Sequence, residues 1–136
     1  MIAFLLAVAA AVDGTPLGVL APQALPAKGC ASYLFTADGT KRFVAMASAE
    51  AGTLRLVLDG TTVDAARGTQ TGAAGYGFAA STEYRGADLS ATLELTAAPR
   101  AELTAGAAVP AATLRVDRAG KDGVAVPLVG IIGCAT

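Results

Sequence analysis

From Cys30 onward, hydrophobic and polar residues alternate with a period of two. This is the pattern of a β-strand that has one buried face. The clearest segment is 53–58 (TLRLVL), in which every second residue is leucine, and segment 89–95 (LSATLEL) repeats the pattern. Since no segment carries a convincing helical stripe, the sequence predicts an all-β domain.

Short strands of this kind recur along the chain, separated by glycine- and aspartate-containing turn signals. Asp59-Gly60 is a strong two-residue hairpin signal, because both residues tolerate a positive φ. About eight strands at this spacing are typical of an antiparallel barrel or a sandwich, and the pattern leaves both open. The predicted strands are residues 32–35, 42–46, 53–58, 61–65, 76–85, 89–95, 112–117 and 124–129.

Prolines mark two irregular places in this pattern. Pro127 removes a backbone N–H from the predicted strand 124–129, so we expect that strand to lie at a sheet edge or to bulge there. Residues 97–110 are rich in alanine and contain Pro99 and Pro110. We expect this segment to form a long connection.

The start of the chain is an apolar run, residues 1–12 (MIAFLLAVAAAV). It is shorter than the roughly 20 residues of a membrane-spanning helix, and its length and small residues fit a signal peptide. No Lys or Arg precedes the run, and a buried N-terminal helix or strand is the alternative. Residues 13–28 hold three prolines and are predicted to be a linker. Residues 29–136 then form a single β domain, in a periplasmic or secreted protein without a stable membrane span.

Two cysteines, Cys30 and Cys134, lie at the two ends of the patterned region. An even number of cysteines in an exported chain indicates a disulfide, which here would tie the first strand to the last. Two buried free thiols are the alternative.

Composition excludes several classes of function. The formal net charge is −1 and charged residues make up 15% of the chain, which argues against binding nucleic acid or anionic membranes. The absence of histidine excludes the common nucleophilic, acid–base and zinc sites built on that residue. The glycines at 72, 75 and 77 lack the order of a phosphate-binding loop. Glu83 and Glu94 are expected on outward strand faces. We therefore predict a protein that is not an enzyme and has no metal site and no cofactor.

One stretch resembles the periplasmic and membrane-bound inhibitors of c-type lysozyme. The matching order is Leu58-Asp59-Gly60, then Thr71-Gly72 leading to Tyr76, then Arg85-Gly86-Ala87-Asp88, within about residues 54–95. This chain has threonine and arginine where the family has serine and lysine, and it carries an extra residue before Tyr76. Its segment 97–133 is also much longer than the family's tail.

The resemblance implies a small exported β-barrel with an N-terminal and a C-terminal cysteine. It also implies that Thr71, Gly72, Tyr76 and Arg85 form a binding site for a lysozyme, with Thr71 and Arg85 facing the catalytic carboxylates. The broader expectation is an exported, non-catalytic binding or accessory protein of the cell envelope. A structural subunit of the envelope is the remaining alternative.

Overall fold

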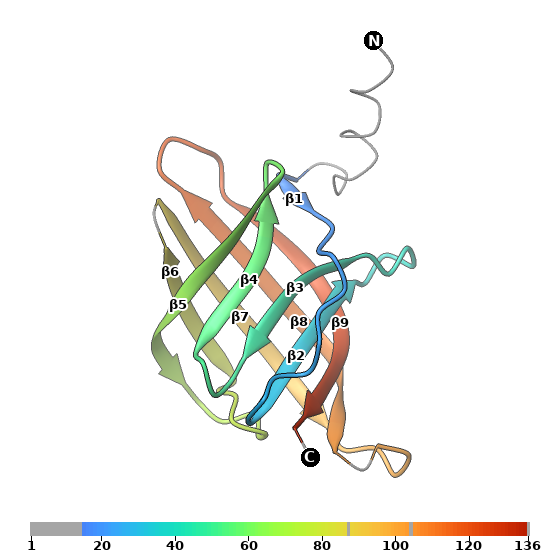
Figure 1. Cartoon of the computed structure of the whole chain (residues 1–136). Coiled ribbons are helices and arrows are strands. Elements are labelled where there is room, and N and C mark those ends of the chain that lie inside the picture. Colours follow the sequence, from blue (N-terminus) through green and yellow to red (C-terminus); the bar gives the residue numbers. More distant parts are fainter. Residues whose placement is uncertain (1–14, 87, 104, 136) are drawn as a thin grey trace.

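The computed structural model describes residues 15–86, 88–103 and 105–135, and this part of the chain contains strands and turns but no helix (Figure 1). No helix long and apolar enough to cross a membrane occurs among these residues. The strands are β1 (Leu17–Gly18), β2 (Cys30–Thr36), β3 (Phe43–Ser48), β4 (Thr53–Leu58), β5 (Thr61–Thr71), β6 (Ser81–Gly86), β7 (Leu89–Ala98), β8 (Gly106–Arg118) and β9 (Val124–Cys134).

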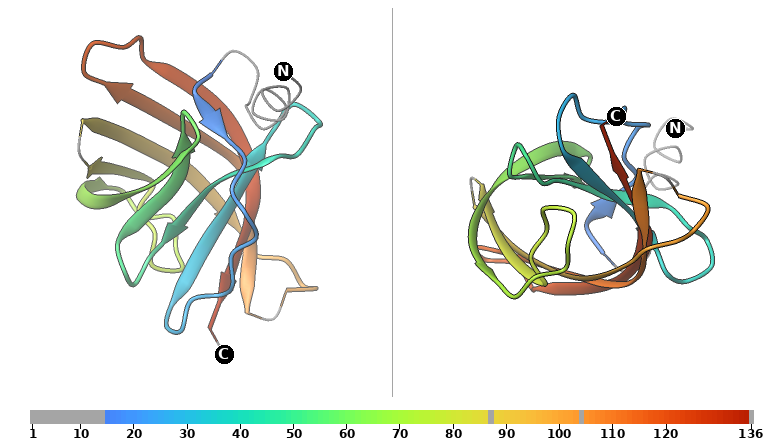
Figure 2. Two further views of the ribbon diagram at one scale, coloured as in Figure 1. Left: turned by 45° about the horizontal axis from the view of Figure 1, so that its top comes forward. Right: turned by 90° about the horizontal axis from the view of Figure 1, so that it is seen from below.

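Strands β2 to β9 form a closed antiparallel barrel. Each strand pairs with the next along the chain, and β9 pairs back onto β2 through seven consecutive residue pairs. The view along the barrel shows these strands as a ring (Figure 2). The all-β prediction is confirmed, and the architecture is the barrel rather than the sandwich.

The barrel interior is filled by the alternating apolar residues that the sequence analysis identified. The inward residues of β4 (Leu54, Leu56 and Leu58) and the matching residues of β7 and β8 are buried. Most of these side chains are leucine, valine or alanine, and Phe78 and Tyr84 are the aromatic ones. The core therefore consists mainly of small and branched aliphatic side chains, which suit the narrow interior of an eight-stranded barrel.

The prediction of a long connection at residues 97–110 is wrong. β7 continues to Ala98 and β8 begins at Gly106, so the connection covers only residues 99–105. Pro110 lies inside β8, where the register with β9 shifts between Val109 and Ala112. The bulge accommodates the proline. An alanine-rich strand shows little contrast between its two faces, which is why the alternation is hard to see in the sequence.

Pro127 lies opposite Thr113 of β8, close to this bulge. β9 is not an edge strand, because β8 and β2 pair with its two sides. The last pair between β2 and β9 is Thr36 with Leu128, and beyond it the Pro127 carbonyl accepts a hydrogen bond from the Ala37 N–H. The missing N–H of Pro127 thus falls where β2 has ended, so no hydrogen bond of the ladder is lost.

Residues 15–28, in which the sequence predicts a linker, run along the outside of the barrel (Figure 1). Leu17 pairs with Leu58 of β4 and is fully buried. Further along, Leu20 packs with Ala31 and Met46 in a small cluster outside the barrel core. We call residues 15–28 the strap, because they cross the outer face of β4, β3 and β2 before entering β2.

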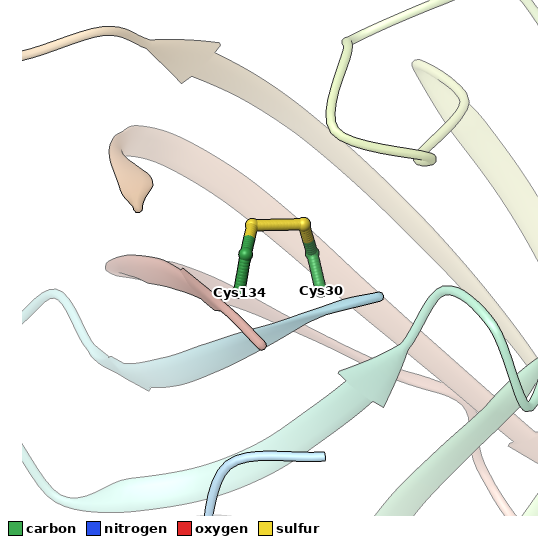
Figure 3. The surroundings of a disulfide bond; sticks show 2 residues. All are labelled: Cys30 and Cys134. Carbon is green, nitrogen blue, oxygen red and sulfur yellow. A yellow bond between two sulfur atoms is a disulfide. The ribbon is translucent and has the colours of Figure 1, made fainter. Parts of the chain in front are cut away.

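The disulfide between Cys30 and Cys134 is confirmed (Figure 3). The two residues are the first register pair between β2 and β9, so the bridge fastens the end of the seam that closes the barrel. The two strands also approach closely at Gly130, where a Cβ atom would collide with the backbone oxygen of Tyr33.

The opposite end of the barrel is spanned by an ion pair. Arg118 pairs with Leu89 in register, and its guanidinium reaches the carboxylate of Asp59, in the β4–β5 turn, at 2.7 Å. The hydrogen bond from Arg118 lowers the pKa of Asp59, and that from Arg55 in the same way lowers the pKa of Asp64. Both carboxylates are therefore charged at neutral pH.

We expect that replacing both cysteines with alanine lowers the free energy of unfolding by about 4–5 kcal/mol, because the bridge closes a loop of 104 residues. Urea denaturation of the oxidised protein and of the double variant measures this difference. Reduction of the unmodified protein should reproduce the effect, whereas the double variant should not respond to reductant. Equal denaturation midpoints would contradict the expectation.

Candidate functional site

The four candidate residues lie on and around the hairpin formed by β5 and β6. Thr71 is the last residue of β5 and pairs with Ser81, the first residue of β6. Gly72 follows with a φ of 71°, a conformation that glycine adopts without strain. A Cβ atom at Gly72 would lie 2.9 Å from the Cβ of Ala80, so glycine also allows the two ends of the loop to meet.

Residues 72–80 form a loop across the disulfide-bonded end of the barrel (Figure 2, right). The predicted strand 76–85 is wrong in its first half, because β6 begins only at Ser81. Phe78 anchors the loop, since its side chain is buried in the barrel core. Gly75 and Phe78 exchange two backbone hydrogen bonds and leave Tyr76 and Gly77 as a two-residue turn.

Tyr76 is held in an unusual conformation at the tip of this loop. Its φ is 60° and that of Gly77 is 87°, as in a type I′ turn, which requires positive φ at both central residues. Asparagine, aspartate or glycine is usual at the first of these positions, and tyrosine there is strained. The side chain of Tyr76 is 36% exposed, so burial in the core does not explain its presence.

Arg85 lies near the other end of β6 and is exposed. Thr82 and Tyr84 point into the barrel, so the alternating residues Ser81, Glu83 and Arg85 point outward, together with Thr71 opposite Ser81. Ser81 and Arg85 are four positions apart on β6, a distance of roughly 13 Å along the strand. The structure thus brings Thr71 and Arg85 onto one outer face, but not into direct contact.

The guanidinium of Arg85 forms no salt bridge with the described residues, and that of Arg115 on β8 is paired with Asp117. Glu83 lies opposite Thr92, and Glu94 lies opposite Ser81 on the same outer face. Their outward orientation is as expected. Two carboxylates on a convex sheet face do not enclose a substrate between them, as a glycosidase requires.

Buried polar groups in the described part of the chain are few. Burial raises the pKa of Tyr84, so its hydroxyl is neutral at physiological pH. The hydroxyl of Ser32 is buried and has no hydrogen-bond partner among the described residues, a feature for which the sequence gives no signal. No group of three or more potential metal ligands occurs in the described ranges.

Two hollows lie outside the candidate residues. One of about 500 Å³ is bordered by the beginning of the strap and by Val57, Asp59 and Thr62. A shallower one of about 280 Å³ lies on the outer face of β7 and β8, around Leu95 and Ala112. Neither is lined by Thr71, Gly72, Tyr76 or Arg85, so the candidate site is a convex surface rather than a pocket.

Comparisons with protein families, with curated proteins and with solved structures find no match to this chain.

Replacing Tyr76 with asparagine should stabilise the protein by about 1 kcal/mol, because asparagine accepts the left-handed conformation more readily than tyrosine. The shift of the urea midpoint relative to the unmodified protein measures this effect. Tyr76→Phe is the matched control and should leave the midpoint unchanged, since it keeps the strain. A lower midpoint for Tyr76→Asn would mean that packing of the tyrosine ring outweighs the strain.

Proposed function

We propose that this chain is an exported, non-catalytic binding or accessory protein of the cell envelope, located in the periplasm or outside the cell. The observation that carries the proposal is the disulfide at the seam of the barrel. Such bridges persist in oxidising compartments and are rare in the cytosol. The apolar residues 1–12 supply a candidate export signal, and they lie outside the described residues.

The outer face of β5 and β6, together with the tip of the loop 72–80, is the proposed binding surface. Three features support it: an arginine, Arg85, that forms no salt bridge with the described residues, an exposed hydroxyl at Thr71 and a strained, exposed tyrosine at Tyr76. Strained residues are often found at functional sites, where the strain is compensated by the surrounding structure. Arginine and tyrosine are also enriched among residues that dominate protein–protein binding energy.

A specific form of this proposal is inhibition of a c-type lysozyme, which rests on the sequence resemblance. The cleft of such an enzyme holds two catalytic carboxylates, which suit a guanidinium and a hydroxyl donor. Thr71 and Arg85 project from one side of the molecule, so a single approach of the barrel presents both. Their separation of roughly 13 Å along β6 requires a cleft that extends over several sugar units.

A structural envelope subunit is the alternative class. Assembly of that kind commonly uses a free sheet edge, to which another strand is added. Within β2–β9 every strand has a neighbour on both sides, so these strands offer no such edge. This favours a discrete binding protein.

Export is tested by expressing the full chain in a bacterium and separating periplasm from cytoplasm. We expect the chain in the periplasm, with neither cysteine reacting with a thiol reagent until reductant is added. A chain without residues 2–12 is the control and should remain in the cytoplasm. Retention of both forms in the cytoplasm, with two reactive thiols, would contradict the proposed location.

Inhibition is tested by titrating the oxidised protein against a c-type lysozyme that is digesting cell walls. We expect inhibition that weakens at least about tenfold in Arg85→Ala and in Thr71→Val, because each removes a polar group from the contact. Arg115→Ala and Thr113→Val are matched controls on the outer face of β8 and should inhibit like the unmodified protein. Absence of inhibition at high micromolar protein would exclude the lysozyme target and leave the broader proposal standing.

A further inference from the structure

The beginning of the strap is built into the wall of the barrel. β3 pairs with β4 only as far as Leu56, and beyond that point β1 takes the place of β3, with Leu17 opposite Leu58 (Figure 1). The Asp59 N–H continues this pairing by donating a hydrogen bond to the Pro16 carbonyl at 3.0 Å. β1 therefore completes the wall where β3 no longer pairs with β4.

The side chains of this part of the strap fill space that the barrel would otherwise leave open. Leu17 is fully buried and belongs to the same core cluster as Leu54 of β4. Leu20 is 4% exposed and packs with Met46, and its N–H donates a hydrogen bond to the Phe43 carbonyl at 2.8 Å. A barrel without these residues would have an opening beside β4, so the folded protein needs the beginning of the strap.

Polar contacts hold the middle of the strap. Arg55 donates one hydrogen bond to the side-chain oxygen of Gln23, at 2.8 Å, and two to the carboxylate of Asp64. The Tyr33 hydroxyl donates a hydrogen bond to the Ala24 carbonyl at 3.0 Å. The strap is thus attached to the barrel from its first strand to its middle.

These contacts limit where an export leader can end. Leaders are usually about 15–30 residues long and are cut after a small residue that has another small residue two positions before it. By length alone, the cut would fall inside the strap, which contains the small residues Ala21 and Ala27. A cut after either one would remove Leu17 and Leu20 from the folded domain. The packing of the strap therefore favours a cut before residue 15.

We propose that export removes residues 1–11 by hydrolysis of the peptide bond between Ala11 and Val12, and that the mature protein keeps the whole strap. Water supplies the hydroxyl of the new Ala11 carboxyl group and a hydrogen of the new Val12 amino group. A membrane-bound peptidase of the export pathway catalyses this step. The inference rests on the proposed export and names its processing site.

The sequence before the strap provides the residues that such a peptidase requires. Ala9 and Ala11 place a small side chain at both of the positions that are recognised before the cut. Residues 12–16 separate the bond from Leu17, the first buried residue of the described chain. Five residues of extended chain span at most roughly 18 Å, so the peptidase reaches the bond while Leu17 stays in the core.

Amino-terminal sequencing and mass spectrometry identify the cut in protein recovered from the periplasm of a bacterium that expresses the full chain. We expect a mature chain that begins at Val12. Ala9→Leu should lower the processed fraction at least about tenfold, because it places a large side chain where the peptidase requires a small one. Ala27→Leu makes the same change at an exposed position of the strap and should be processed like the unmodified chain.

A mature chain that begins inside the strap, or at Ala10, would overturn the assigned bond. An exported chain that keeps residues 1–11 would overturn it as well. Each of these results leaves the proposed export standing. A chain found only in the cytoplasm would instead overturn the export and the cleavage site together, so the two failures are distinguishable.

The role of Leu17 is tested on the mature, oxidised chain. Leu17→Ala should lower the urea midpoint, because it leaves a cavity in the core. Leu25→Ala is the matched control within the strap and should leave the midpoint unchanged, since Leu25 is 57% exposed. Equal midpoints for the two variants would mean that the barrel does not need the beginning of the strap, and would contradict the reason for its retention.

Discussion

The pairing of β9 with β2 is the constraint on which the rest of the structure depends. It joins residues about a hundred positions apart, so it carries a large loss of chain entropy before any local contact forms. In return it removes both free edges of the eight-stranded meander and encloses one apolar interior. The disulfide at the end of this seam, the glycine at Gly130 and the bulge in β8 are all features that make the closure possible.

The small side chains of the core explain why a disulfide reinforces the closed barrel. Among the described residues, Phe78 and Tyr84 alone contribute aromatic rings to the interior, and much of the remainder is leucine, valine and alanine. Each such side chain removes less apolar area from water than an aromatic ring does. The rings of Tyr33, Phe35 and Phe43 lie outside the barrel interior, where they add little to the core. A barrel of this composition gains proportionately more from a cross-link than a domain rich in large side chains would.

Much of this fold is predictable from the sequence, and the exceptions have physical causes. Alternation in 53–58 and 89–95 is clear because leucine alternates with polar residues, and both strands lie where predicted. The start of β8 is hidden because alanine occupies both faces there. Whether the strands form a barrel or a sandwich depends on whether β9 pairs with β2 or lies in a second sheet packed against the first. The alternation of residues along a strand does not encode this difference. The cysteine positions at the two ends of the pattern were the strongest indication that those ends meet.

The candidate site was likewise predictable from the sequence only in part. The alternation of inward and outward residues along a strand correctly predicts that Glu83 and Glu94 point outward. It also places Arg85 on the same outer face. It does not reveal that Tyr76 is in a left-handed turn, because glycines on both sides of that residue allow many conformations. Nor does it reveal which face of β2 is inward, since outward and inward apolar residues look alike in a strand with both faces uncharged.

The strap gives a physical reason for keeping large apolar side chains on the outside of a barrel with so few large residues inside. If Tyr33, Phe35 and Phe43 served the core alone, their rings would be inward, as Tyr84 is. Their outward position places Tyr33 and Phe43 against the cluster that includes Leu20 of the strap, and the Tyr33 hydroxyl donates a hydrogen bond to the Ala24 carbonyl. The β5–β6 face, on the opposite side, is polar, and Arg85 there forms no salt bridge with the described residues. One side of the barrel is therefore occupied by its own strap, whereas the β5–β6 face on the other side is left exposed to solvent.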